Sequence, residues 1–139
     1  MNNLTKFSAW RTDSFFSIIF VATKRALSKP TNIFAVTGTN GKTSFVNIVT
    51  EFLNKNGYSA ISSGNIGSSP LNSIKKNYDY LVLELSSYQL YYSENLLLDY
   101  GVVLNIASDH LDWHGSKKNY LNSKLKIDSF LGKEARFLE

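Results

Sequence analysis

The chain has 139 residues, no cysteine and a formal net charge of +4, from 15 lysines and arginines against 11 aspartates and glutamates. This length allows one domain with a substantial core, and the absence of cysteine excludes disulfides and thiolate metal sites and fits a reducing cytoplasm. The charge excess is small and no basic run is interleaved with aromatics, so we expect phosphate-bearing ligands rather than nucleic acid.

The first 30 residues contain an apolar run at positions 15–22, directly after Asp13 and Ser14. The run is about half of the roughly 20 residues that a membrane-spanning helix needs, so we expect no membrane span. A secretory signal peptide is the alternative, but no A-x-A-like cleavage site follows the run. The sequence favours a packed helix that begins at Asp13 or Ser14 and ends before Pro30.

From residue 31 onward, apolar strand patterns alternate with helical patterns. Strands are predicted at residues 32–36, 58–61, 80–85 and 101–106, and helices at 42–56, 73–77 and 116 to about 130. Gly57 is the expected stop of the first of these helices, and Ser116 the expected N-cap of the last. The residues expected on the buried face of helix 42–56 are Phe45, Ile48, Val49, Phe52 and Leu53. Such alternation is typical of an α/β fold with a parallel sheet flanked by helices.

The loop between the first strand and the first helix has the composition of a phosphate-binding loop. Its glycines would let backbone N–H groups turn toward an anion, and the helix N-terminus adds positive potential. Lys42 can reach β- and γ-phosphate oxygens, and the Thr43 hydroxyl can bind Mg²⁺. Two residues separate the glycines instead of the usual four, so a plain strand–helix turn is the alternative. The predicted nucleotide-binding residues are Gly38, Thr39, Asn40, Gly41, Lys42, Thr43 and Ser44.

This shortened loop resembles the phosphate loop of the Mur ligase family, which has the form G-T-x-G-K-(T/S). Four further stretches follow in the family's order: SGNIGSSP at 63–70, LVLELSSYQL at 81–90, LNIASDHLDWHGS at 104–116 and NYLNSKLKI at 119–127. The resemblance implies the P-loop NTPase-like central domain of an ATP- and Mg²⁺-dependent ligase of peptidoglycan precursor synthesis. The implied reaction phosphorylates a carboxylate and then forms an amide with an amino acid.

The G-N-I-G and E-L-S-S-Y-Q-L stretches look most like the family members that add D-glutamate to UDP-N-acetylmuramoyl-L-alanine. Those two small molecules are therefore the implied substrates, and Asn65 and Ser86 the implied substrate contacts. Asn and Ser in glycine-rich turns are also frequent turn formers. Three other functions stay open: another Mur ligase, a folylpolyglutamate synthase, or a nucleotide-binding module without catalysis.

Three more residues acquire roles from the resemblance, and each also has a simpler interpretation. Glu84 ends a buried strand, where a carboxylate is costly unless paired or metal-bound, and it would share a first Mg²⁺ with Thr43. His110 would bind a second Mg²⁺, although imidazole suits softer metals better. Lys124 would be carbamylated and hold the same ion; the alternative is a solvated lysine on a basic helix.

Lys42, His110 and Lys124 are thus the predicted catalytic residues, and His114 is expected to be structural or to support the metal ligands. Family members have three domains, so residues 31–139 would be the first part of the central domain, and residues 1–30 are too few for a UDP-binding domain. We expect this chain alone to bind ATP weakly and not to turn over. Its natural partner would be the remainder of the ligase, and an uncovered sheet edge would favour self-association.

Overall fold

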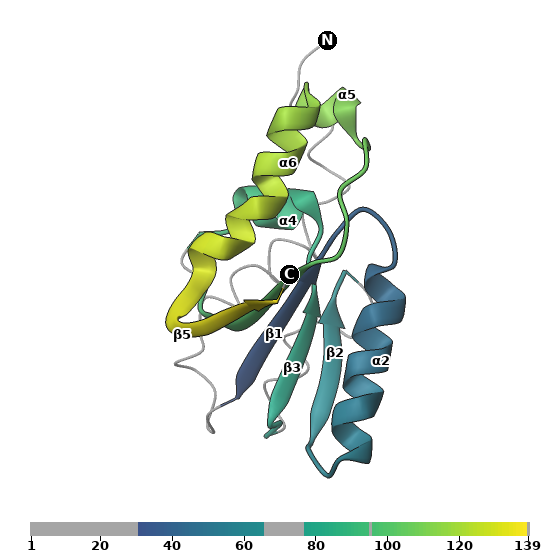
Figure 1. The fold of residues 1–139 in the computed structure, drawn as a ribbon, viewed down its shortest axis with the longest axis vertical. Helices are drawn as coiled ribbons and strands as arrows, with labels where there is room; N and C mark the ends of the chain where they lie inside the picture. The colour runs from purple at the N-terminus through teal and green to yellow at the C-terminus, as the bar shows by residue number, and fades with distance from the viewer. Residues whose placement is uncertain (1–30, 66–76, 95, 139) are drawn as a thin grey trace.

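The computed structural model describes residues 31–65, 77–94 and 96–138, so the helix predicted within residues 1–30 lies outside the described part. Helices flank a five-stranded sheet, which confirms the predicted fold class (Figure 1). The elements are β1 (Asn32–Thr37), α2 (Lys42–Lys55), β2 (Ala60–Gly64), β3 (Tyr80–Glu84), α4 (Ser87–Tyr92), β4 (Leu98–Val103), α5 (Leu111–His114), α6 (Lys117–Leu125), the 3-10 helix η3 (Lys126–Phe130) and β5 (Leu131–Leu138). Among the described residues, no helix has both the length and the apolar character needed to cross a membrane.

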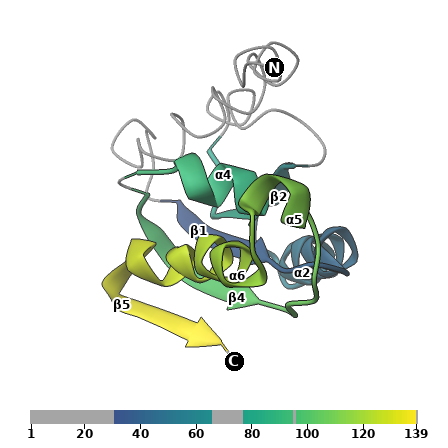
Figure 2. The same cartoon turned by 90° about the horizontal axis from the view of Figure 1, so that it is seen from above.

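All strand pairs of the sheet are parallel, and the strand order is β2-β3-β1-β4-β5, with β5 at the edge beside β4 (Figure 2). β1 lies in the centre, with Ala35 opposite Leu83 of β3 on one side and opposite Gly101 of β4 on the other. The strands β2 and β3 lie on one side of β1, and β4 and β5 lie on the other side. Because all these strands are parallel, the segments that follow β1, β3 and β4 leave the same edge of the sheet, which is the edge where parallel α/β proteins bind ligands.

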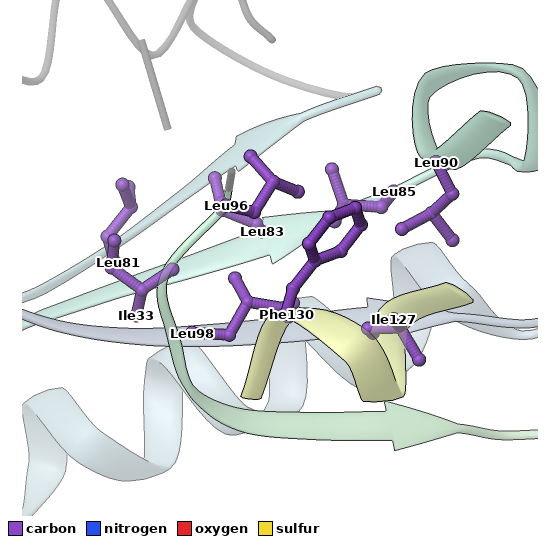
Figure 3. Close-up of a cluster of buried hydrophobic side chains, with 10 residues drawn as sticks. Ile33, Leu81, Leu83, Leu85, Leu90, Leu96, Leu98, Ile127 and Phe130 are labelled. Carbon is purple, nitrogen blue, oxygen red and sulfur yellow. The ribbon is translucent and has the colours of Figure 1, made fainter. Parts of the chain in front are cut away.

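The larger core fills one face of the sheet, beneath α4 and η3 (Figure 3). It combines apolar side chains of β1, β3 and β4 with Leu90 of α4 and with Ile127 and Phe130 of η3. Leu83, Leu90 and Ile127 are completely buried. Its buried members are Ile33, Ala35, Leu81, Leu83, Leu85, Leu90, Leu96, Leu98, Ile127 and Phe130. This packing fixes α4 and η3, and with them α6, against the sheet.

Helix α2 covers the opposite face, where Val46 packs against Val36 and Val82. Phe45, Val49 and Leu53 pack against the same cluster and are partly buried.

The prediction for this helix was wrong at two positions, because Ile48 and Phe52 are 65% and 64% exposed. At about 100° per residue the five expected side chains form a wide apolar stripe. The sheet contacts the part of the stripe around Val49 and Leu53, together with Val46, which the prediction left out.

Several element boundaries differ from the prediction. β2 runs to Gly64, into a serine- and glycine-rich stretch that was predicted as loop. β4 begins and ends three residues earlier than predicted. The prediction excluded the polar residue Asp99 from the strand, but Asp99 lies inside it and accepts a 2.7 Å hydrogen bond from the Ile33 N–H. The short α4, α5 and the strand β5 were not predicted, and the predicted helix 73–77 falls almost entirely outside the described residues.

The long helix predicted from Ser116 is present, but it changes character at its end. Ser116 is the N-cap, and its Oγ accepts a 3.1 Å hydrogen bond from the Asn119 N–H. The α-helix ends at Leu125, and the remaining residues to Phe130 form η3. Gly57 ends α2 as predicted, with a φ of +84°.

Gly64 brings the end of β2 into unusually close contact with the end of β3. A Cβ at this position would lie 2.2 Å from the Glu84 carbonyl oxygen, and the φ of +108° is one that residues with side chains rarely adopt. The next residue, Asn65, donates its backbone N–H to the same carbonyl at 3.0 Å. The absence of a side chain at Gly64 therefore places Asn65 beside Glu84.

We predict that Gly64→Ala destabilises the protein by about 1–3 kcal/mol from overpacking alone, with further cost from the backbone conformation. Chemical denaturation would measure the loss in free energy of unfolding. Gly57→Ala is the matched control, because Gly57 also has positive φ but a Cβ there would meet nothing within 4 Å. Equal losses in the two variants would contradict the close contact at Gly64.

Candidate functional site

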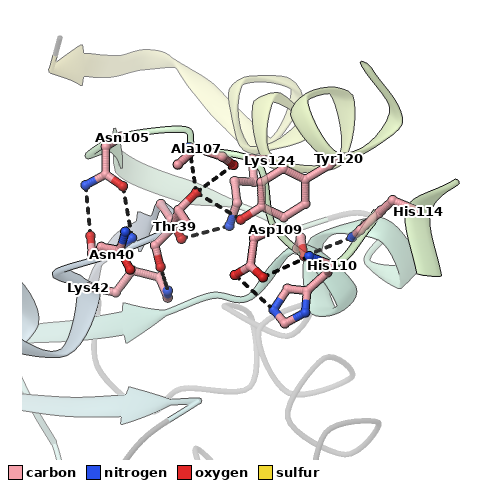
Figure 4. A network of polar contacts seen from close by, with 12 residues as sticks. Thr39, Asn40, Lys42, Asn105, Ala107, Asp109, His110, His114, Tyr120 and Lys124 are labelled. Atoms are coloured by element: carbon pink, nitrogen blue, oxygen red, sulfur yellow. Dashed lines mark hydrogen bonds and ion pairs between the residues drawn. The ribbon is translucent and has the colours of Figure 1, made fainter. Parts of the chain in front are cut away.

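The predicted phosphate loop lies between β1 and α2, at the carboxyl edge of the sheet. Gly41 is the N-cap of α2 in left-handed conformation, with no side chain capping the helix and no acidic residue in its first turn. The start of this 14-residue helix is therefore electrostatically suited to an anion. The Lys42 ammonium folds back over the loop and donates a 2.9 Å hydrogen bond to the Thr39 carbonyl (Figure 4).

Glu84 lies directly beside the start of α2, as the sequence predicted. Its side chain is buried, with 2% exposure, and one carboxylate oxygen accepts a 2.8 Å hydrogen bond from the Thr43 hydroxyl. The other oxygen accepts from the Asn65 side-chain amide at 3.2 Å. Carboxylate, hydroxyl and amide oxygens are ligands that Mg²⁺ prefers, so the donor set of Thr43, Glu84 and Asn65 fits this ion.

Lys124 is buried, with only 2% exposure, so the alternative of a solvated lysine is wrong. Its ammonium donates a 2.8 Å hydrogen bond to the Gly38 carbonyl and lies 4.7 Å from the ring centre of Tyr120, one turn earlier on α6 (Figure 4). Burial, helped by the positive charge of Lys42, lowers the pKa of Lys124 to about 8, and Asp109 opposes this shift. A lysine with such a pKa reaches its neutral, nucleophilic form far more easily than a surface lysine.

His110 lies at the N-cap of α5 and is the one described residue other than glycine with positive φ, at 50°. Its Nε2 is 3.4 Å from an Asp109 carboxylate oxygen, and both side chains are close to half exposed. Asp112 and His114 do not join them, and no three His, Asp or Glu side chains of the described residues converge as a metal site. With Lys124 as an ammonium, His110 and Lys124 do not fit a second metal ion.

His114 has the structural position that was expected for it. The ring is buried, with Nε2 3.0 Å from the Ser87 hydroxyl of α4 and Nδ1 3.3 Å from the Ser123 hydroxyl of α6. Burial, with smaller effects of His110 and Lys124, lowers the pKa of His114. The neutral ring thus connects α4 and α6 across α5.

Ser86 forms the N-cap of α4 in a capping box. Its Oγ accepts from the Gln89 N–H at 3.2 Å, and the Gln89 side chain accepts from the Ser86 N–H at 2.8 Å. This side chain therefore has a local structural role. Its predicted contact with substrate, like that of Asn65, stays a prediction.

A second set of contacts, which the sequence analysis missed, holds the phosphate loop from the β4 side (Figure 4). The Thr39 hydroxyl lies 3.0 Å from the Tyr120 hydroxyl and accepts a 3.0 Å hydrogen bond from the Ala107 N–H. Asn105 bonds the backbone of Asn40 with both atoms of its side-chain amide, each at 2.9 Å. The available signal was a polar residue, Asn105, directly after the apolar run of β4.

Residues 36–138 match the Mur ligase middle domain family. The chain belongs to this family. Two curated relatives, both UDP-N-acetylmuramoylalanine–D-glutamate ligases, are 44% identical over 104 residues (Pseudothermotoga lettingae) and 46% identical over 101 residues (Streptomyces coelicolor). The matches cover 75% and 71% of this chain but 24% and 21% of the relatives, so the chain spans about a quarter of their length.

Solved structures show the same fold at lower sequence identity. MurF from Thermotoga maritima in complex with ADP has a TM-score of 0.69 and 23% identity, over 91% of this chain and 32% of that protein. Escherichia coli FolC in complex with DHPP and ADP has a TM-score of 0.58 and 20% identity, over 80% of this chain and 38% of that one. The fold is thus shared by proteins that carry different names.

The depressed pKa of Lys124 predicts a specific pH dependence of stability. Between about pH 8 and 10.5 the unfolded chain holds a proton at this lysine that the folded chain has lost, so the folded state gains stability as pH rises. Relative to Lys124→Met, the wild-type free energy of unfolding should rise across this window by an amount on the order of 2 kcal/mol.

Denaturant unfolding at a series of pH values would measure this difference. Lys117→Met, at an exposed position of the same helix, is the control and should leave the pH profile unchanged. Parallel profiles for wild type and Lys124→Met would contradict the burial of the ammonium.

Proposed function

We propose that residues 31–139 are the first part of the central, ATP-binding domain of a ligase that joins D-glutamate to UDP-N-acetylmuramoyl-L-alanine. The observation that carries the proposal is the 2.8 Å hydrogen bond between the Thr43 hydroxyl and the buried Glu84 carboxylate, directly after the phosphate loop. The pair offers hard oxygen ligands at the place where a nucleotide's phosphates meet the helix N-terminus. The choice of D-glutamate rests on the names of the relatives.

The residues of this chain would act mainly by positioning and by charge. The α2 N-terminus and the Lys42 ammonium stabilise negative charge on the transferring phosphoryl group. Lys42 would exchange the Thr39 carbonyl for phosphate oxygens. Thr43 and Glu84, with Asn65 beside them, would hold Mg²⁺, which when bound neutralises charge on the triphosphate. Asn65 and Ser86, at the same edge of the sheet, are the proposed contacts of the muramoyl substrate.

Lys124 is the proposed site of a carbamate. The neutral amine would attack CO₂, forming one N–C bond and releasing one proton, and the product would be an anion with two oxygens. This change turns a group that repels a metal ion into one that can bind it beside His110. Burial of Lys124 and its low pKa support the proposal, because only a neutral amine reacts with CO₂.

A second function is a ligase that acts on a different acid, such as the one bound by FolC. The fold alone does not distinguish them, since FolC shares it at 20% identity. The 44% and 46% identities of the D-glutamate-adding relatives favour the first function.

An activity assay of the full-length enzyme that carries this sequence tests the proposal. With ATP, Mg²⁺ and UDP-N-acetylmuramoyl-L-alanine, phosphate release should depend on added D-glutamate. Release that requires a folate substrate instead would show that the second function is correct.

Two lysine variants make the assay specific for the phosphate loop. Lys42→Ala should lower the rate by about 10²–10³, as loss of one electrostatic group at a transition state typically does. Lys117→Ala, at the exposed start of α6, should leave the rate unchanged. Equal effects of the two changes would count against the assigned role of the loop.

The carbamate can be observed directly. With ¹³C-labelled bicarbonate, we expect the wild-type protein to show a carbamate carbon signal by NMR that Lys124→Met lacks. The signal should grow from pH 7 to pH 9, because the fraction of neutral amine increases through a pKa of about 8. An identical signal in Lys124→Met would place the carbamate elsewhere.

A further inference from the structure

The phosphate loop has two residues between its glycines instead of the usual four. The backbone of these two residues is hydrogen-bonded to Asn105. The Thr39 N–H donates a 2.9 Å hydrogen bond to the Asn105 backbone carbonyl. The Asn40 N–H donates at 2.9 Å to the Asn105 side-chain oxygen, and the Asn105 side-chain NH₂ donates at 2.9 Å to the Asn40 carbonyl. Both peptide N–H groups between the two glycines are therefore bonded to one residue.

We propose that Asn105 is a positioning residue for the phosphate loop, which it holds in its binding conformation before any nucleotide arrives. The inference rests on the proposed function for the identity of the ligand, a nucleoside triphosphate. The fixed loop geometry itself is independent of that ligand.

The β4 side of the loop is anchored at more than one point. A Cβ on Gly38 would lie 3.2 Å from the Leu104 Cβ and 3.4 Å from the Asn105 backbone, so the two segments are in close contact. The Thr39 hydroxyl adds its bond from the Ala107 N–H. Asn105 is the member of this group whose side chain reaches the loop backbone, and it does so with a donor and an acceptor together.

These hydrogen bonds determine which N–H groups of the loop remain available to bind an anion. With the Thr39 and Asn40 N–H groups occupied, phosphate oxygens are left with the N–H groups of residues 41–44 and with the Lys42 ammonium. The first backbone bond of α2 runs from the Phe45 N–H to the Gly41 carbonyl, so the N–H groups of residues 42–44 precede the helical bonding pattern. The short loop thus binds through the helix end, and Asn105 holds its first half in place.

A loop fixed in advance loses less conformational entropy when it binds a ligand. Removal of the Asn105 side chain should therefore weaken ATP binding more than it slows the chemical step. In the full-length enzyme, Asn105→Ala should raise the KM for ATP by about tenfold, the effect of one lost hydrogen-bonded anchor, with a smaller change in kcat.

The chain offers a matched control with the same local geometry. Asn54 of α2 bonds the backbone of Ala60 reciprocally, accepting from its N–H at 3.0 Å and donating to its carbonyl at 3.0 Å. Asn54→Ala removes an equivalent pair of bonds at the opposite end of α2. It should lower global stability to a similar extent and leave the loop unaffected.

Amide hydrogen exchange without nucleotide tests the proposal directly on this chain. In the wild type, the Thr39 and Asn40 amides should exchange more slowly than those of Gly41 and Lys42. Asn105→Ala should accelerate exchange at Asn40 by about tenfold. Asn54→Ala should accelerate Ala60 and leave Asn40 unchanged. Fast exchange of Asn40 in the wild type, or equal acceleration of Asn40 by both variants, would overturn the proposal.

Two further measurements keep the result decisive. If Asn105→Ala does not fold, Asn105→Ser retains a short acceptor and should give intermediate exchange at Asn40, and an unchanged rate would contradict the role of Asn105. Titration of the full-length enzyme with Mg-ATP should shift the amide signals of residues 41–44 more than those of Thr39 and Asn40. Absence of any ATP effect alongside the expected exchange pattern would refute the proposed function and leave the loop anchor standing.

Discussion

The carboxylate of Glu84 is the group on which the arrangement of the site depends. A carboxylate with 2% exposure is costly unless it is hydrogen-bonded, and here it accepts from the Thr43 hydroxyl and the Asn65 amide. These two donors come from the start of α2 and from the residue after β2. One buried acid therefore brings three separate segments to the carboxyl edge of the sheet. Gly64 contributes to this arrangement, because the absence of a side chain there lets the β2 backbone approach Glu84.

A buried lysine performs the matching task on the other side of the loop. Lys124 bonds the Gly38 carbonyl, and Tyr120 on the same helix lies within hydrogen-bonding distance of Thr39. Residues 120 and 124 are one turn apart on α6, so one face of this helix contacts two successive loop residues. The loop is thus held between an acid on the β3 side and a helix on the β4 side. Under the proposed function, Glu84 would in addition bind Mg²⁺ and Lys124 would carry the carbamate.

The sequence predicted those parts of the structure that depend on local patterns. Continuous apolar runs identified β1 and β3, and the glycine-rich segment between β1 and α2 identified the loop. The resemblance to the Mur ligases implied that Thr43 and Glu84 share one Mg²⁺, and in the structure the two side chains are hydrogen-bonded. The sequence did not predict that Lys124 is buried, because the helix around it is rich in lysine and gives no periodic apolar signal. The resemblance to the Mur ligases singled out Lys124, and its burial follows from the packing of α6.

The central position of β1 also constrains the order in which the fold can be completed. Its hydrogen-bonding partners are β3 and β4, which lie far later in the chain than α2 and β2. When the ribosome has synthesised the chain only as far as the phosphate loop, β1 has no neighbouring strand on either side. Both neighbours exist only after Val103 has been added. Contacts between such distant segments slow folding, because a long chain must be closed before they form. The segment that would bind ATP is therefore made early in synthesis but acquires its supports late.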